Sequence, residues 1–217
     1  MKTILIILLF VFSLSSCAHS ANANYPADWW TEIPRSEAKD WEILPQDAKP
    51  GEVILSKRTE LGVFSNLSHS PFVLDGVKYN SIEGLWQGMK YPDPDLLDDE
   101  RFKETNWPHK REEVYLLSSW DSKSAGDLAN KIYKANKFSL INYKDHKFNY
   151  NDGRAGSAFH LDLITKAITG KINQNPAIKK LLIQTKGLIL KPDHKMKEDS
   201  LGSYKYHEIL MKIRDEI

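Results

Sequence analysis

Three polar side chains that could do chemistry follow one another at helical spacing in the stretch YNSIEGLWQGMKYP, residues 79–92. Glu83, Gln87 and Lys90 are separated by four and three residues, so a helix would place them along one flank. Trp86 lies beside them and offers a ring on which a planar group or a cation can stack. An acid, an amide, a cation and a stacking surface in one small region suit the binding of a ribosyl group.

Each of these side chains also has a purely structural interpretation. Glu83 lies in the first turn and Lys90 near the last, where the helix dipole favours an acid and a base respectively. Gln87 can be a surface amide and Trp86 a core residue, and for these two the structural interpretation is the favoured one. For Glu83 and Lys90 the functional interpretation weighs at least as much.

Two glycines add to the functional interpretation of this helix. Gly84 and Gly88 each cost a helix about 1 kcal/mol relative to alanine. Their presence inside a short apolar helix indicates that something approaches this part of the backbone closely.

The elements around this helix indicate an α+β protein. Ser81 is a suitable N-cap for a helix over 82–90. Alternating residues over 71–79 predict a hairpin whose turn is formed by Asp75 and Gly76. GEVILSKR at 51–58 reads as a strand to which a short strand at 188–191 could return. Further helices are expected at 95–103, 110–118, 123–135, 159–168, 176–184 and 206–216. We therefore expect one mainly helical domain with a small antiparallel sheet near its N-terminal side.

Charge and motif content exclude several function classes. With 30 Lys and Arg against 29 Asp and Glu, the net charge is +1, so no nucleic-acid partner is expected. The mixed-charge runs at 143–148 and 191–199 are interpreted as solvated loops. The histidines are isolated, and phosphate-binding glycine loops and nucleophile elbows are absent, so neither a metal nor a cofactor is expected.

The N-terminus has the features of an export signal. Lys2 precedes an apolar run at 4–12 that is too short to span a bilayer permanently. The single cysteine, Cys17, ends the tetrapeptide LSSC, which resembles a bacterial lipobox. We expect a lipoprotein signal peptide at 1–16, a lipidated Cys17 with a tether at 17–50 that docks on the domain, and a folded domain at 51–217. The alternative is ordinary cleavage after the ANA at 21–23, which would leave a soluble exported protein.

The run ELGVFSNLSHSPFVLDGVKYNSIEGLWQGMKY, residues 60–91, resembles the opening of the YbiA-like or NADAR family. The family pattern is a Gly-x-Phe-Ser-Asn-Phe segment, an Asp-Gly hairpin, a Ser-x-Glu and an aromatic-Gln-x-x-Lys helix. Leu67 and Gly84 depart from it. The matching positions are Gly62, Phe64, Ser65, Asn66, Asp75, Gly76, Ser81, Glu83, Trp86, Gln87 and Lys90.

Later blocks at 123–129, 170–190 and 209–217 are similar to the same family, so the resemblance covers most of the chain from residue 51 onward. The run at 198–206 lacks the tryptophan often found before the terminal helix of family members. This departure bears on which substrate the chain would accept.

The resemblance implies cleavage of N-glycosidic bonds to ribose, in ADP-ribose conjugates or ribosylamino-pyrimidines, with Glu83 as the catalytic carboxylate. It implies substrate contacts from five residues: Phe64, Asn66, Trp86, Lys90 and His160. Asn66 would hold ribose hydroxyls, and Lys90 would pair with a phosphate or stabilise an opened sugar. A carboxylate suits this chemistry because breaking the C1–N bond builds positive charge on the sugar.

The acid that would protonate the leaving base stays open among Asp152, His160 and Asp193. His160 is expected near the start of a helix opened by Ser157, where the helix dipole would lower its pKa. Two other functions also stay open. One is a non-catalytic, envelope-anchored domain that binds a nucleotide or ADP-ribose, and the other is an envelope interaction protein that uses its tryptophan-rich tether.

Overall fold

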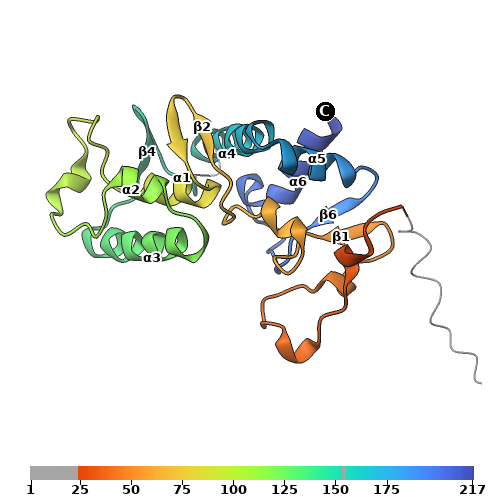
Figure 1. Ribbon diagram of the computed structural model, residues 1–217. Coiled ribbons are helices and arrows are strands. Elements are labelled where there is room, and N and C mark those ends of the chain that lie inside the picture. The colour runs from red at the N-terminus through yellow and green to blue at the C-terminus, as the bar shows by residue number, and fades with distance from the viewer. Residues whose placement is uncertain (1–23, 153–154) are drawn as a thin grey trace, which may run out of the picture.

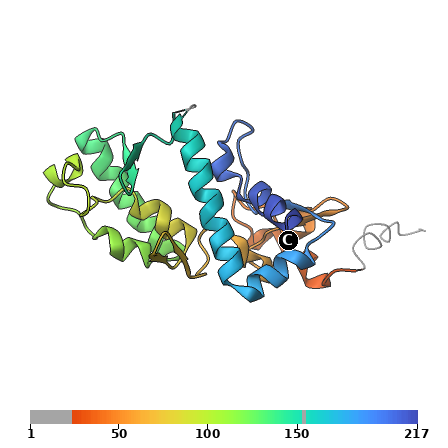
Figure 2. The same ribbon diagram turned by 90° about the horizontal axis from the view of Figure 1, so that it is seen from above.

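The longest helix, α4 (Ala155–Gln174), runs through the middle of the molecule in the computed structural model and separates two groups of elements (Figure 2). The structure describes residues 24–152 and 155–217, so the expected signal peptide and Cys17 lie outside the described residues. On one side of α4 lie three helices, α1 (Ile82–Gly88), α2 (Arg111–Tyr115) and α3 (Ser119–Asn136). On the other lie α5 (Pro176–Gln184) and α6 (Tyr206–Asp215) (Figure 1). No helix within the described ranges has the length and apolar character needed to cross a membrane.

Three two-stranded sheets complete the mainly helical α+β fold, which confirms the expected class. The strands β2 (Phe72–Leu74) and β3 (Val77–Tyr79) form the predicted hairpin. Its turn has Asp75 at φ 50° and Gly76 at φ 82°, as a two-residue turn of this kind requires. The site helix α1 begins three residues after this hairpin ends.

The predicted return of the strand near residue 190 is confirmed, but its direction is parallel. Strand β6 (Ile189–Lys191) pairs with β1 (Glu52–Ile54) in parallel register. A parallel pair needs a long crossover between its strands, and here most of the domain supplies it. The fold thus holds both antiparallel hairpins and one parallel pair.

The interpretation of 143–148 as a solvated loop is wrong. Strands β4 (Ile141–Tyr143) and β5 (His146–Phe148) form a second antiparallel hairpin, with Lys144 at φ 52° in its turn. Tyr143 and Phe148 are buried. The charged residues of this run are mostly at the turn and on the outer face, which is why the composition suggested a loop.

The predicted helix at 95–103 is also wrong, since only a 3₁₀ turn at Glu100–Lys103 forms there. Carboxylates bind backbone N–H groups in and just before this range. Asp99 accepts from the N–H of Asp93 at 2.8 Å and of Arg101 at 3.0 Å, and Asp93 accepts from Asp95 at 3.2 Å. Aspartate often competes with helical hydrogen bonding in this way.

The other helices form where they were expected, with different ends. Helix α5 agrees fully, and α6 and α1 end one and two residues early. Helix α2 is shorter than predicted, while α3 and α4 extend beyond the predicted ranges at both ends. Packing against neighbours extends α3 and α4 through residues of weak helical pattern.

The segment before residue 51 packs against the domain. Trp29 is fully buried in the main core, and its Nε1 donates to Glu60 Oε1 at 2.7 Å. Trp30 Nε1 donates to the carbonyl of Glu52 at 3.0 Å. The 3₁₀ turns of this segment are Ala27–Trp30, Arg35–Glu37 and Pro45–Asp47.

The close approach indicated by the glycines of α1 is made by the protein itself. A Cβ on Gly84 would lie 2.7 Å from the carbonyl oxygen of Leu117, and one on Gly88 would lie 2.4 Å from the ring of Tyr115. Ser81 caps α1 by accepting from Gly84 N at 2.8 Å and donates to Leu117 O at 2.9 Å. The glycines therefore let α1 pack on α2 and the turn after it, and this packing sets the orientation of Glu83.

Candidate functional site

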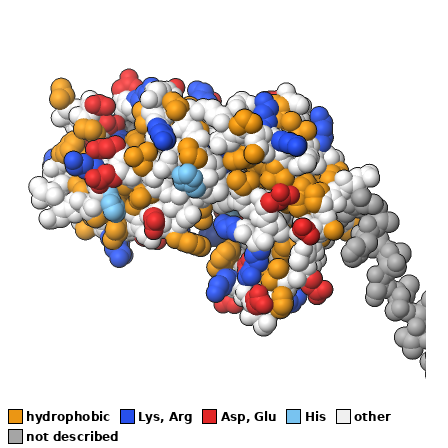
Figure 3. Space-filling model, viewed as in Figure 1, with side chains coloured by type: hydrophobic (Ala, Val, Ile, Leu, Met, Phe, Trp, Pro, Cys, Tyr) orange, Lys and Arg blue, Asp and Glu red, His pale blue; other side chains and the backbone are white. Residues whose placement is uncertain are grey.

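A cleft of about 570 Å³ lies where the two groups of elements meet, and α1, α3 and α4 each contribute to its lining. The remaining walls come from Trp41, Lys57, Lys90, Tyr150, the loop at 65–67, the segment at 194–196, and Ser203, Tyr204 and Tyr206. In the space-filling view the surface is hollowed between the lobe formed by the N-terminal segment and the body above it (Figure 3). The volume is within the range usual for ligand pockets.

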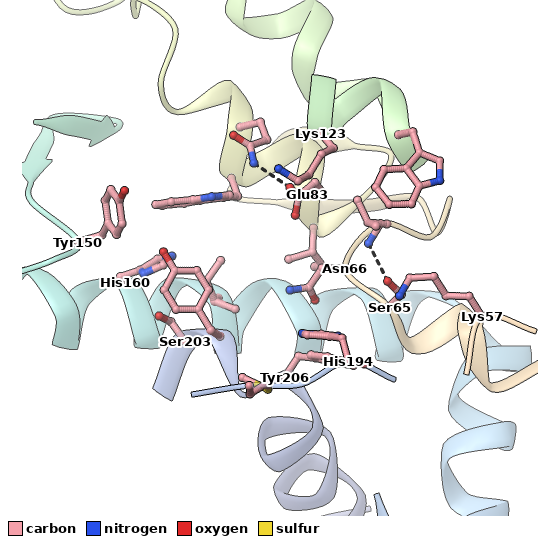
Figure 4. Close-up of a pocket in the computed structure, with 18 of the residues that line it drawn as sticks. Lys57, Ser65, Asn66, Glu83, Lys123, Tyr150, His160, His194, Ser203 and Tyr206 are labelled. Carbon is pink, nitrogen blue, oxygen red and sulfur yellow. Dashed lines mark hydrogen bonds between the residues drawn. The ribbon is translucent and has the colours of Figure 1, made fainter. Parts of the chain in front are cut away.

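Glu83 projects into the middle of this cleft from the first turn of α1 (Figure 4). Its backbone N–H donates to the carbonyl of Asn66 at 2.9 Å, which ties the helix start to the 65–67 loop. Its Oε1 accepts from Gln87 Nε2 at 2.7 Å, and the side chain is half-buried. Sequence spacing predicted that Glu83 and Gln87 share a flank of the helix, and the hydrogen bond joins them along that flank.

The favoured interpretation of Gln87 as a surface amide is wrong. Its side chain is 5% exposed, and its amide is held against α3 at Gly126. Gln87 therefore orients the carboxylate of Glu83, while its own Oε1 stays without a partner.

Buried polar atoms without a hydrogen-bond partner gather at this cleft. Within residues 24–152 and 155–217 there are five such side-chain atoms, and four of them belong to residues that line it. The four are Asn66 Oδ1, Gln87 Oε1, His160 Nδ1 and Ser203 Oγ. Because an unsatisfied buried polar group costs about 1–3 kcal/mol, such a concentration is typical of a site that completes its bonds with a ligand.

Lys90 lies on the same flank, 6% exposed, and donates from Nζ to Asn130 Oδ1 at 2.9 Å. Its Nζ is 5.4 Å from the ring centroid of Trp86. Burial lowers the pKa of Lys90 to about 8, against the opposing pull of Glu83. At pH 7 the amine is then mostly protonated, with about a tenth of it uncharged, which is more than for an ordinary lysine.

One end of the cleft is aromatic. Trp86 stacks on His160 at 4.4 Å between centroids and meets Tyr150 edge-on at 4.9 Å. His160 is 1% exposed, and burial lowers its pKa to about 4. The cause is burial, since His160 lies in the second turn of α4 and not at its first residues. The predicted direction of the pKa shift is right, while the predicted cause is wrong.

None of the three candidates for the leaving-group acid is set up for that role. His160 is neutral near pH 7 because of its low pKa. Asp193 is buried, which by itself raises its pKa, but hydrogen bonds from His194 and Lys57 hold that pKa below its ordinary value. Asp152 is exposed and is not among the lining residues.

Phe64, expected to bind substrate, is instead a core residue. It is 2% exposed, belongs to the main hydrophobic cluster and does not line the cleft. Its aromatic ring anchors the 3₁₀ turn Glu60–Phe64, directly before the loop that carries Asn66. The other expected contacts, Asn66, Trp86, Lys90 and His160, do lie together.

Several lining residues carry no signal in the sequence. The interpretation of 191–199 as a solvated loop is wrong for His194, Lys195 and Met196, which form part of the wall. Lys57 and Lys123 add positive charge. With Lys90 and Lys195 they make four lysines against Glu83, the one carboxylate among the described lining residues. These residues come from four separate parts of the chain, so no local spacing connects them.

Comparisons with known proteins leave the family open. No protein-family model matches the sequence, and no curated protein matches it. The fold is similar to the NMR structure of the E. coli protein YbiA. The identity is 17% and the TM-score 0.48, with 85% of this chain and 92% of that chain covered. A likeness at this level carries no argument about what the chain binds or does.

Among the described residues, no group of three or more His, Cys, Asp or Glu side chains is placed to hold a metal ion.

Proposed function

We propose that this protein is an N-glycosidase that hydrolyses the bond between ribose C1 and a nitrogen of its aglycone. The supporting observation is the placement of Glu83: an oriented carboxylate in a cleft, surrounded by buried polar atoms that lack partners. This is the activity that the resemblance of residues 60–91 to the YbiA-like family implies.

The chemistry follows from charge. As the C1–N bond breaks, its electron pair leaves with the aglycone nitrogen and positive charge develops on the ribose ring. The carboxylate of Glu83 stabilises this charge or takes a proton from the water that attacks C1. Gln87 keeps one carboxylate oxygen in place through its 2.7 Å hydrogen bond. Asn66 and Ser203 offer hydrogen bonds to sugar hydroxyls, and protonated Lys90 offers a partner to a phosphate.

The single carboxylate restricts the leaving group. Within the described part of the cleft, Glu83 cannot both carry negative charge for the sugar and protonate the departing base. Aglycones that leave without prior protonation, such as a pyridinium, are therefore expected to be cleaved faster than amines. This ordering can be measured with a series of ribosyl compounds that differ only in the aglycone.

The deciding experiment replaces Glu83 with Gln, which preserves shape and an acceptor oxygen for Gln87. Release of ribose, or of ribose 5-phosphate from the 5′-phosphorylated members, from a panel of N-ribosyl compounds should fall about 10²–10⁴-fold, while ligand-induced thermal shifts persist. Glu112→Gln, on an exposed face of α2, is the matched control and should leave activity unchanged.

The alternative is a non-catalytic domain that binds a nucleotide or ADP-ribose. It is favoured by the absence of a placed leaving-group acid among the described residues. Ligand-induced stabilisation of equal size in the wild type and Glu83→Gln, with no turnover of any aglycone by either, would establish this alternative and refute the enzyme.

A further inference from the structure

Two tryptophan rings at the cleft have no aromatic neighbour. Trp29, Trp30, Trp86 and Trp107 each pack against another aromatic ring. Among the aromatic contacts of residues 24–152 and 155–217, none involves Trp41 or Trp120. Both line the cleft, with 43% and 59% of their surface exposed. Exposed indoles beside a cleft are ready to stack on a ligand.

Trp41 is held firmly although its side chain is exposed. Its carbonyl accepts from Lys195 N at 3.3 Å, and the next two residues are tied down as well. Glu42 forms a β-bridge with His194, and Ile43 N donates to Asp193 O at 2.8 Å. The backbone that carries the indole is thus fixed before any ligand arrives, which lowers the entropic cost of stacking.

Positive charge accompanies these rings. Lys57 Nζ lies 5.7 Å from the ring centroid of Trp41 and forms an ion pair with Asp193 at 2.5 Å. Lys123 lies one turn after Trp120 on α3 and also lines the cleft, as does Lys195. Figure 4 shows Lys57 at the end of the site opposite Tyr150 and His160, with Glu83 and Asn66 between them. A ligand that reaches from Glu83 toward Lys57 therefore meets both stacking surfaces and cations.

We propose that Trp41, Trp120 and Lys57 form an outer subsite that binds a planar heteroaromatic ring carrying a neighbouring phosphate, at a distance from the glycosidic bond. The proposal rests on the proposed function, because it takes the ribosyl group to lie at Glu83. It assigns a role in substrate choice to the segment before residue 51, which lies outside the region that resembles a known family. The favoured ligand is then a nucleoside-diphosphate ribosyl compound rather than a ribosyl monophosphate.

The test compares two probes, ADP-ribose and ribose 5-phosphate, by calorimetric titration. Trp41→Ala and Trp120→Ala should each lower the affinity for ADP-ribose about tenfold, the usual effect of losing one base-stacking ring. Binding of ribose 5-phosphate should change less than twofold. Trp41→Phe should restore most of the affinity for ADP-ribose. Phe102→Ala removes an aromatic ring of similar exposure away from the cleft and should change neither probe.

Two outcomes would overturn the outer subsite. In one, the affinities for both probes fall by the same factor in the alanine variants. In the other, ADP-ribose binds the variants with the same affinity as the wild type, or it does not bind the wild type at all. Either result leaves the N-glycosidase untouched if release of ribose still depends on Glu83. Conversely, tryptophan-dependent binding of ADP-ribose, with no cleavage of any N-ribosyl compound in the panel, supports the subsite and refutes the N-glycosidase.

Discussion

Gly126 of α3 leaves the space that the side-chain amide of Gln87 occupies. A Cβ atom at Gly126 would lie 1.9 Å from Gln87 Oε1 and 2.1 Å from its Cδ. Gln87 orients Glu83, so the lack of a side chain at Gly126 of α3 allows the carboxylate on α1 to be held in its position.

Gly126→Ala should therefore displace Gln87 and break its hydrogen bond to Glu83. We expect overpacking to lower the free energy of unfolding by about 1–3 kcal/mol. We also expect kcat to fall under conditions in which the variant is still folded, because Gln87 no longer holds Glu83 in place. Gly170→Ala is the control, because a Cβ there meets its nearest atom at 3.5 Å. Equal effects of the two variants on kcat would show that Gln87 does not position Glu83.

Lys171 is a buried clamp on the loop that carries Asn66. Its Nζ donates to Val63 O at 2.8 Å, Ser65 O at 2.9 Å and Ser68 Oγ at 2.8 Å, and the residue is 1% exposed. Burial lowers the pKa of Lys171 to about 7. The three acceptors keep the amine bound in spite of the cost of burial.

Replacing Lys171 with Met should remove three buried hydrogen bonds, with Ser68 left as a donor to the carbonyls of Val63 and Ser65. This loss should lower the free energy of unfolding by about 1–3 kcal/mol, measured by urea titration. The loosened loop should also weaken binding of ribose 5-phosphate. Lys166→Met, at an exposed position of the same helix, should do neither. Unchanged binding in Lys171→Met would mean that the loop keeps its shape without the clamp.

His160 makes the free energy of unfolding depend on pH. Its folded pKa of about 4 lies below the ordinary value of 6.5, so between these values the unfolded chain binds a proton that the folded chain does not. Stability is complete above pH 6.5 and should fall by about 3 kcal/mol as pH drops to 4. His160→Phe keeps a ring against Trp86 and should remove this part of the decline. His69→Phe, at an exposed position, should retain this part of the decline. Identical pH profiles of stability for wild type and His160→Phe would contradict the prediction.

We also propose that the chain is exported and lipid-anchored at Cys17, a residue outside the described ranges. Labelled palmitate should enter the protein in bacterial cells and should be lost in Cys17→Ser, which should appear in the soluble fraction. Ser16→Ala, beside the cysteine, should keep the label. Labelling that persists without Cys17 would remove the anchor from the proposal.

Local sequence was sufficient where an element depends on its own residues. The Asp75–Gly76 turn, the Ser81 cap and the shared flank of Glu83 and Gln87 all involve residues within a few positions of one another. Local rules failed at 95–103 because the carboxylates of Asp93 and Asp99 bind the backbone there. The same two carboxylates form buried ion pairs with Arg101 and Arg111, and both guanidinium groups donate to Asn142, which lies far away in sequence.

The sequence by itself determined the flank of α1 that carries Glu83, Gln87 and Lys90, because helical spacing follows from backbone geometry. Only the tertiary structure decided that Phe64 lies in the core, that Gln87 is buried, and that Trp41 reaches the same cleft as Trp120. Burial and proximity arise from contacts between segments far apart in sequence, such as Tyr25 and Lys186, which are 161 residues apart. The pKa values of Lys90 and His160 follow from that burial, so the chemistry of the site is a property of the folded chain.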